Sequence, residues 1–337
     1  MSKILITGAS GFIGSNLVEY LIKDKKPDEN LRLLVPPWEN LQNLPKGVFE
    51  IAIADVRNET EVERAAEGVD VIYHLAAKTI IPNGSYDYYK DTNVDGTRNL
   101  LAAARKHRVK KFIFFSSISV YGLPAWVGDI EGCDEEWPKN FSEAYGHTKA
   151  EAEKILLEAN KNWGLNYIII RPTTVYGPKD KAGIFQLLKA INLGVFFFIG
   201  NAKNKMDYVY VEDLVRAARI SEKEEIVNED FIIGAGKPTT QRDLVRIAAS
   251  VLGKSVSKIY VPKLLALFMA YFIQGISNIL HIRPLLFPDR VKVLTSNCYF
   301  DISKAKGMLK YTPKYDLNKG IKQTVRWFMN KDYGLSK

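Results

Sequence analysis

Short apolar runs alternate with longer amphipathic segments through the first half of the chain. The apolar runs are rich in β-branched and aromatic residues and lie at 4–7, 31–35, 49–53, 69–75, 112–116 and 167–170. Between them, apolar residues recur at helical spacing over 13–22, 59–66, 92–106 and 142–162. Strands that are apolar on both faces and separated by helices are typical of a parallel sheet covered on both sides. The pattern therefore predicts an α/β chain with a doubly wound parallel sheet.

The regular alternation ends after residue 172. Loops rich in Gly, Pro and Lys then separate apolar segments at 184–193, 209–220 and 244–252. Ligands of doubly wound sheets bind beyond the C-terminal ends of the strands, so we expect a smaller α/β C-terminal lobe to cover the substrate there. The predicted division is a Rossmann domain over 1–178, with a return near 207–234, and a mainly substrate-binding lobe over 179–337.

A glycine-rich turn directly follows the first predicted strand. Thr7-Gly8-Ala9-Ser10-Gly11-Phe12-Ile13-Gly14 leads straight into the first predicted helix. Gly8 permits a tight turn, Gly11 lets the backbone approach a pyrophosphate, and Gly14 lets helix and strand pack closely. Strand, turn and helix in this order predict a site for NAD or NADP. The expected contacts are Gly8, Ser10, Gly11, Phe12, Ile13 and Gly14.

The end of the second predicted strand does not decide between the two cofactors. An acidic residue is expected there to hold the ribose 2′-hydroxyl of NAD, but Val35-Pro36-Pro37 places neither an acid nor an arginine. Glu39 is the nearest candidate carboxylate, and we favour NAD slightly. After the third strand, Asp55 and Val56 are expected near the adenine, where a carboxylate can accept from the exocyclic amine. The alternative for Asp55 is an ordinary loop or cap residue.

Tyr145 and Lys149 lie four residues apart in a predicted helix and therefore share one face. An adjacent ammonium would stabilise a tyrosine phenolate, so Tyr145 is a candidate for proton exchange. The pattern alone is common on helix surfaces, and the dinucleotide turn gives it its weight. Ser117 follows a buried strand at its C-terminal end, where it is placed to hydrogen-bond a substrate oxygen.

These motifs together resemble the extended short-chain dehydrogenase/reductase family, also called the NAD-dependent epimerase/dehydratase family. The resemblance spans nearly the whole chain. It runs through 7–14, 55–56, 74–77, 93–97, 116–122, 145–149, 171–178, 207–214 and 300–305.

The resemblance implies a division of roles among the site residues. Tyr145 would be the acid/base, Lys149 would lower its pKa and hold the nicotinamide ribose, and Ser117 would orient the reacting oxygen. The expected cofactor contacts also include Leu75, Ala76, Ala77, Lys78, Asn93 and Pro172. For Asn93 the alternative is a bond to backbone within the fold. The family also suggests a homodimer, through helices such as 92–106 and 142–162.

Departures from the family patterns separate the candidate reactions. Sugar-nucleotide dehydratases carry an Asp-Glu pair where this chain has Ile118-Ser119, which disfavours dehydration. Sugar-nucleotide 4-epimerases place an arginine where Met206 stands, and the neighbouring Lys205 is not equivalent. We therefore expect an NAD(P)-dependent oxidoreductase that interconverts a secondary alcohol and a ketone on a bulky small-molecule substrate. The alternatives are a nucleotide-sugar 4-epimerase, with Lys205 and Arg290 on the phosphates, and a non-catalytic NAD(P)-binding scaffold.

A long apolar run at 264–280 has three interpretations. It is either a buried helix of the second lobe, an apolar wall for a lipid-like substrate, or a helix that lies on a membrane surface. A long apolar insertion here resembles the 3β-hydroxysteroid dehydrogenase and dihydroflavonol reductase branch of the family. It is short for a membrane span, which needs about 20 residues.

Composition and charge narrow the class of protein. The chain has 337 residues, 47% hydrophobic and 25% charged, with a formal net charge of +9, which excludes disordered and low-complexity chains. Its densest basic run, 106–111, follows a predicted helix, where cations favour the helix dipole, so no nucleic-acid partner is expected. Cys133 and Cys298 have neither disulfide nor metal-ligand spacing, so no metal is expected. The N-terminus lacks a signal-peptide pattern, and we expect a cytoplasmic protein.

Overall fold

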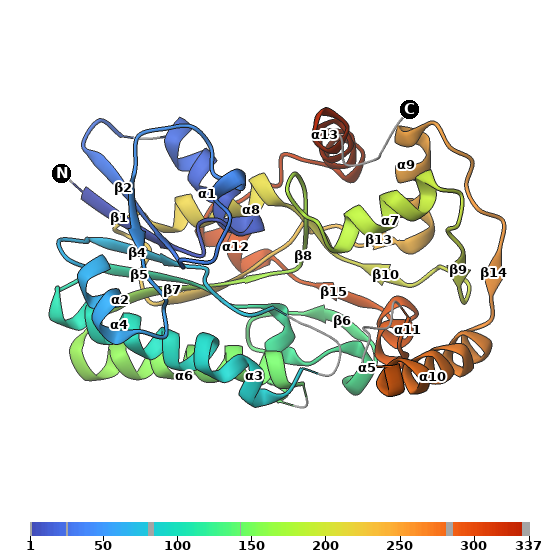
Figure 1. The fold of residues 1–337 in the computed structure, drawn as a ribbon, viewed down its shortest axis with the longest axis horizontal. Helices are drawn as coiled ribbons and strands as arrows, with labels where there is room; N and C mark the ends of the chain where they lie inside the picture. Colours follow the sequence, from blue (N-terminus) through green and yellow to red (C-terminus); the bar gives the residue numbers. More distant parts are fainter. Residues whose placement is uncertain (1, 25, 80–83, 142, 281–285, 332–337) are drawn as a thin grey trace.

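The computed structural model describes residues 2–24, 26–79, 84–141, 143–280 and 286–331. A large sheet with helices on both faces occupies one end of the molecule, and smaller sheets with α7, α9, α10 and α11 occupy the other (Figure 1). Between the two ends lie β8, β10, β15 and β6, which belong to the smaller sheets.

The large sheet confirms the predicted doubly wound fold. Within the described residues it has seven parallel strands in the order β12-β7-β5-β4-β1-β2-β3. They are β1 (Ser2–Thr7), β2 (Glu29–Val35), β3 (Glu50–Ile53), β4 (Val71–His74), β5 (Lys111–Phe115), β7 (Asn166–Pro172) and β12 (Glu229–Ile233). The first six correspond to the predicted runs. The chain lays β2 and β3 on one side of β1 and β4 on the other, which creates a crevice at their C-terminal ends.

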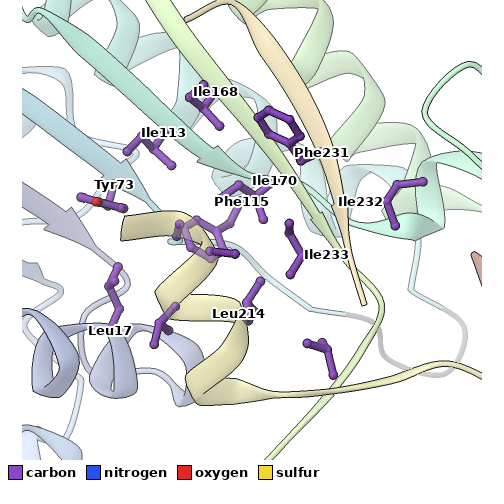
Figure 2. Close-up of a cluster of buried hydrophobic side chains, with 14 of the residues drawn as sticks. Leu17, Tyr73, Ile113, Phe115, Ile168, Ile170, Leu214, Phe231, Ile232 and Ile233 are labelled. Atoms are coloured by element: carbon purple, nitrogen blue, oxygen red, sulfur yellow. The ribbon is translucent and has the colours of Figure 1, made fainter. Parts of the chain in front are cut away.

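Both faces of the sheet are buried because successive strand residues alternate between two apolar cores. In β1, Ile4 and Ile6 join one core, whereas Leu5 joins the other. Helices α1 (Phe12–Lys23) and α8 (Val211–Ser221) cover the first face, and Leu17 and Leu214 pack there among strand residues such as Phe115 (Figure 2). The second face is covered by α2 (Glu59–Ala65), α4 (Gly96–Lys106) and α6 (Ala144–Trp163).

The bounds of two helices differ from those that their sequence patterns indicate. The segment expected at 92–106 starts as a π-helical turn, Asp91–Asp95, after the short α3 (Tyr86–Lys90), and continues as α4. The segment expected at 142–162 becomes α6 at Ala144, and Ser142 lies outside the described residues. Glu143 caps α6, because its carboxylate accepts hydrogen bonds from the backbone N–H groups of Tyr145 and Gly146 (2.9 and 2.6 Å). The cap fixes Tyr145 in the first turn.

The remaining elements form smaller sheets and the helices around them. Strands β13, β10, β15 and β6 make one sheet in that order, while β11 pairs with β8 and β14 pairs with β9. These strands are β6 (Ile130–Cys133), β8 (Thr174–Tyr176), β9 (Phe198–Ile199), β10 (Lys205–Met206), β11 (Tyr208–Tyr210), β13 (Thr239–Thr240), β14 (Tyr260–Val261) and β15 (Cys298–Phe300). The helices are α5 (Pro124–Val127), α7 (Gly183–Asn192), α9 (Gln241–Leu252), α10 (Lys263–Leu280), α11 (Pro288–Leu294), α12 (Ser303–Met308) and α13 (Leu317–Asn330), with 3₁₀ turns at Leu41–Asn43 and Ile118–Tyr121.

The apolar run at 264–280 forms most of α10, and the exposure of its side chains contradicts one of the three interpretations, that of a buried helix. Its large side chains, such as Leu264 and Phe268, are exposed, whereas Ala266 and Ala270 are buried. The described lining of the central cavity contains no residue of α10, which also argues against the expectation of a substrate wall. Within the described residues, no helix combines the length and hydropathy needed to cross a bilayer.

Candidate active site

A cavity of about 810 Å³ opens at the C-terminal ends of the parallel strands. Its lining contains every residue expected from the sequence to be catalytic or to contact the cofactor, except Asn93. These residues are Gly8, Ser10, Gly11, Phe12, Ile13, Gly14, Asp55, Val56, Leu75, Ala76, Ala77, Lys78, Ser117, Tyr145, Lys149 and Pro172. Residues that are up to 164 positions apart in the chain therefore meet at one crevice, and their individual roles stay predictions.

The glycine turn has the geometry that a dinucleotide needs. Gly8 has a φ of +66°, and a Cβ added there would lie 2.7 Å from the Ala76 backbone nitrogen. A Cβ on Gly14 would lie 2.0 Å from the Gly8 carbonyl oxygen, so only glycine lets α1 start this close to β1. The free N–H groups at the start of α1 then face the cavity, where they can bind phosphate oxygens. The turn fits the diphosphate of NAD or NADP.

At the other end of the dinucleotide crevice, acidic and basic side chains meet at the ends of β2 and β3. Glu39 lines the cavity and accepts a hydrogen bond from the Ser10 hydroxyl (3.4 Å). Arg57 donates to Asp55 (Nε–Oδ2 2.7 Å) and lies over the Trp38 ring, 5.5 Å from its centroid. The sequence reasoning missed Trp38 and Arg57, because nothing in the linear pattern indicated that the two loops meet. The one available signal was that an aromatic and a basic residue each follow the end of a predicted strand.

A buried hydrogen-bond chain holds the end of β4 against the turn. Thr97 Oγ1 donates to the Asn93 carbonyl (2.7 Å) and thus accepts from Nε2–H of His74 (2.9 Å). His74 Nδ1 then accepts from Thr7 Oγ1 (2.7 Å), which accepts in turn from the Ala76 N–H (3.1 Å). Burial lowers the pKa of His74 well below its usual value, so the ring stays neutral and suits these roles. The chain fixes the backbone that forms one edge of the cavity.

Asn93 lies behind the cavity and not in its lining. Its side-chain oxygen accepts from the Lys78 N–H (2.8 Å), and its amide nitrogen donates to the Lys78 carbonyl (3.1 Å) and to Thr148 Oγ1 (3.2 Å). These are the bonds to backbone that the alternative expected, and direct contact of Asn93 with the cofactor stays a prediction. Asn93 thereby connects the π-helical turn, the loop after β4 and α6.

Ser117, Tyr145 and Lys149 lie together in the middle of the cavity, as predicted. Burial raises the pKa of the Tyr145 phenol, and a hydrogen bond with Ser117 lowers it in part. Ser117 Oγ also accepts from the Ser119 N–H (3.1 Å), which holds the hydroxyl at the end of β5. The oxygen atoms of Ser117 and Tyr145 thus form a pair that can bind one substrate oxygen between them.

In this structure Lys149 bonds the strand end and not Tyr145, and its expected effect on the Tyr145 pKa stays a prediction. Its ammonium donates to the Phe115 carbonyl (2.7 Å) and lies over the Phe114 ring. Burial lowers the pKa of Lys149 to about 7, with the Glu153 carboxylate acting in the opposite direction. No lowering of the Tyr145 pKa by Lys149 is resolved in this arrangement, because the ammonium is oriented towards the strand and is close to losing its proton.

An ion pair that the sequence did not indicate positions α6 on the sheet. Glu153, two turns after Tyr145, accepts from Nε and Nη2 of Arg171 at 2.9 Å each. Arg171 also donates to the Tyr121 hydroxyl (2.8 Å), and Lys139 donates to Glu153 (2.6 Å). Both Glu153 and Arg171 are buried, so these bonds are needed to offset their desolvation. They fix the helix that carries Tyr145 and Lys149 relative to β7.

The far side of the cavity is apolar. Leu123, Pro124, Val175, Met206, Val293 and Cys298 line it and are named the apolar wall below. Lys205 and Arg290, the residues that the epimerase alternative placed on substrate phosphates, are not in the described lining. Met206 is in the lining, at the position where the resemblance expected an arginine in sugar-nucleotide epimerases. The cationic side chains that line the cavity, Arg57, Lys78 and Lys149, all come from the large-sheet part of the chain.

Comparison with known proteins agrees with this site. The model of the NAD dependent epimerase/dehydratase family matches residues 4–234. The chain is 30% identical to 3beta-hydroxysteroid-dehydrogenase/decarboxylase isoform 1 of Arabidopsis thaliana, over 96% of this chain and 79% of the relative. It is also 30% identical to N-acetyl-alpha-D-glucosaminyl-diphospho-ditrans,octacis-undecaprenol 4-epimerase of Escherichia coli O157:H7, over 96% and 94%.

A solved structure of a related enzyme has the same fold. UDP-glucose 4-epimerase of Thermotoga maritima, crystallised with UDP-glucose, matches with a TM-score of 0.77 and 26% identity over 98% of this chain and 99% of that one. The family match confirms the prediction of an enzyme of the dehydrogenase or epimerase type. With its glycine turn, its Ser117, Tyr145 and Lys149 cluster and a match over more than half of its length, the chain belongs to the NAD-dependent epimerase/dehydratase family.

Proposed function

We propose that this protein is an NAD-dependent oxidoreductase that interconverts a secondary alcohol and a ketone on an apolar, lipid-like molecule. The observation that carries the proposal is the apolar wall: beyond Ser117 and Tyr145, the cavity presents Val175, Met206 and Val293 and no described cation. Such a wall favours hydrocarbon by the hydrophobic effect. A diphosphate buried there would lack the charged donors that compensate for its desolvation.

The chain's own residues supply proton transfer and positioning. A dinucleotide held by its diphosphate at the glycine turn would supply the hydride chemistry. Tyr145 would exchange a proton with the substrate oxygen through its phenol, and Ser117 would orient that oxygen by a hydrogen bond. The Ser119 N–H positions the Ser117 hydroxyl, and the Glu143 cap positions Tyr145 at the start of α6. Lys149, with a pKa of about 7, is poised to gain or lose a proton near neutral pH.

Glu39 supports NAD over NADP. Its carboxylate lines the cavity beside Ser10, at the end of the crevice where a ribose 2′-hydroxyl would lie. A carboxylate there accepts from a hydroxyl and repels a 2′-phosphate. Arg57 is the nearby cation that could favour a phosphate, but it is already paired with Asp55 and Asp91.

Similarity to relatives supports a second candidate, a 4-epimerase. The Escherichia coli relative is named for a diphosphate-linked sugar on undecaprenol, and the Arabidopsis relative for a steroid. Both names include a large hydrocarbon, which the apolar wall would accommodate. The epimerase needs a site for the diphosphate as well, and the described lining beyond Tyr145 offers none.

One assay set separates the candidates. The purified protein is incubated with NAD or NADP, or their reduced forms, and a panel of sterols, other lipid-like ketones and alcohols, sugar nucleotides and polyprenyl-diphosphate sugars. Stoichiometric change in reduced nicotinamide with a sterol or ketone supports the oxidoreductase. Sugar inversion without net reduction establishes the epimerase instead. Cofactor binding without turnover on any of them favours the non-catalytic scaffold.

A further inference from the structure

Helix α10 has the reverse of the usual arrangement of a surface helix. Its large apolar side chains face solvent, with Leu264 81% exposed, Phe268 70% and Phe272 64%. Surface helices of soluble proteins normally direct their large apolar residues inward and polar ones outward. The exposed set forms one continuous half of the helix and is called the α10 face. It consists of Leu264, Leu265, Phe268, Met269, Tyr271, Phe272, Ile276 and Leu280.

The opposite side of α10 is small and packs on the protein. Ala266, Ala270 and Ser277 are buried, and the two alanines join Ile199 and Val291 in a local apolar cluster. Leu267 packs partly against this cluster as well, whereas the large side chains of the α10 face project outward. The helix lies against α11 at the edge of the molecule, far from α2 and α4 (Figure 1). An apolar patch of this kind normally marks an interaction site.

The charges around the α10 face select an anionic partner. From residue 244 to residue 280 the chain has four basic residues and no carboxylate, and α11, which packs on α10, carries Asp289 together with Arg290 and Lys292. Lys258 and Lys263 flank the start of α10 and are exposed. With a net charge of +9, a second copy of this chain would bring like charges together at this face, whereas an anionic surface would be attracted.

We propose that the α10 face docks on the surface of an anionic lipid bilayer, with α10 lying in the plane of the interface. Apolar and aromatic side chains on one side of a helix, next to lysines, are the combination that binds such surfaces. Leu264, Phe268 and Phe272 would enter the acyl boundary, while Lys258 and Lys263 remain at the level of the headgroups.

Helix α11 links the docking surface to the cavity wall. It packs on α10 and carries Val293 of the apolar wall, and it also contacts α5, which begins at Pro124 of the same wall. A lipid-like substrate would therefore reach the cavity from the bilayer that α10 touches. This link to the substrate rests on the proposed function, whereas the docking itself does not.

The test is co-sedimentation of the whole protein with vesicles, without cofactor or substrate. Vesicles of phosphatidylcholine with phosphatidylglycerol should bind the protein more tightly than phosphatidylcholine alone. The variant L264E/F268E/F272E should lose at least about tenfold in partitioning, because three exposed apolar side chains become charged. The variant K258Q/K263Q should lose about fivefold per lysine on the anionic vesicles only.

Controls keep the result specific to α10. V48E/L193E/V195E replaces three equally exposed apolar residues elsewhere and should bind as the wild type does. Circular dichroism and dinucleotide binding show that each variant is folded. Failure of the wild type to bind either vesicle, or binding that the α10 variant retains, overturns the proposal. So does a wild-type dimer that becomes a monomer in L264E/F268E/F272E while no vesicle binds, since the α10 face would then contact a second copy. An absence of oxidoreductase activity leaves this binding result intact, which separates the two proposals.

Discussion

The two sides of the cavity differ in whether charged side chains line them. On the side built by the large sheet, Glu39, Asp55, Arg57 and Lys149 line the cavity, and each is held by a polar partner. The apolar wall, built by α5, β8, β10, α11 and β15 or the residues next to them, adds no charged side chain among the described lining residues. The first side is therefore suited to one polar cofactor and one proton transfer. The second side determines which molecule can be placed against them.

The largest expected effect tests the reacting centre that both sides share. Tyr145→Phe should lower turnover by about 10³-fold, because it removes the proton that is exchanged with the substrate oxygen. Cofactor affinity should be unchanged, as judged by quenching of protein fluorescence, to which Trp38 in the lining contributes.

The matched control is Tyr20→Phe on α1, outside the described lining. It should retain full turnover. An active Tyr145→Phe enzyme, or a Tyr20→Phe enzyme that is equally impaired, would contradict the role given to Tyr145.

A smaller effect is expected on the dinucleotide side alone. Gly14→Ala places a Cβ 2.0 Å from the Gly8 carbonyl, so α1 must move away from β1. Overpacking of this kind costs about 1–3 kcal/mol, and we expect NAD to bind about 10- to 100-fold more weakly. Titration calorimetry measures this effect. Gly307→Ala on α12 has open space around the added methyl group and should leave the NAD affinity unchanged.

On the apolar wall, one added charge should change the substrate preference. Met206→Arg places a guanidinium in the lining, and kcat/KM for a lipid-like ketone should fall by about tenfold because the charge is poorly solvated there. Affinity for sugar nucleotides should rise, since an arginine can bind the diphosphate. Lys205→Arg, whose side chain lies outside the lining, should change neither value. If Met206→Arg leaves both unchanged, this side of the cavity does not bind substrate.

The last prediction concerns the pH dependence of stability on the sheet side. The pKa of Lys149 is lowered from 10.5 to about 7, so between these values the unfolded state binds more protons. Stability should therefore rise with pH in this window, by up to about 1.4 kcal/mol per pH unit from this group. Below pH 7 both states are protonated, and the cost of the buried ammonium is fully present.

Denaturant unfolding at several pH values measures this slope, which Lys149→Met should lack. Lys161→Met, at an exposed position of the same helix, should keep the slope of the wild type. Parallel stability curves for the wild type and Lys149→Met would show that Lys149 is not the source of the slope.

The sequence predicted the sheet side well because its signals are local. Alternating apolar runs fixed the first six strands, and Gly8, Gly11 and Gly14 marked a turn whose geometry depends on neighbouring backbone. Even there, the sequence did not decide between cofactor contact and the bonds that Asn93 makes to the Lys78 backbone, because a buried amide in a motif does not reveal which way it faces.

The apolar wall was largely beyond prediction for a physical reason. Met206 was singled out through the resemblance, but Val293 and Cys298 were not placed in the cavity. They meet it only through the pairing of short strands and the packing of α11 on α5, contacts that have no periodic pattern. The orientation of helix α10 could not be predicted either, because a run of apolar residues does not reveal that the small side chains face the protein.

The parallel pairing of β15 with β6 sets the order in which the enzyme can be completed. β15 lies between β10 and β6. The sheet that carries part of the apolar wall therefore lacks one of its two central strands until residues 298–300 are in place. A ribosome releases the glycine turn and the first six strands of the large sheet more than a hundred residues earlier. The nascent chain can thus present its coenzyme crevice while the compartment for the substrate is still open to water.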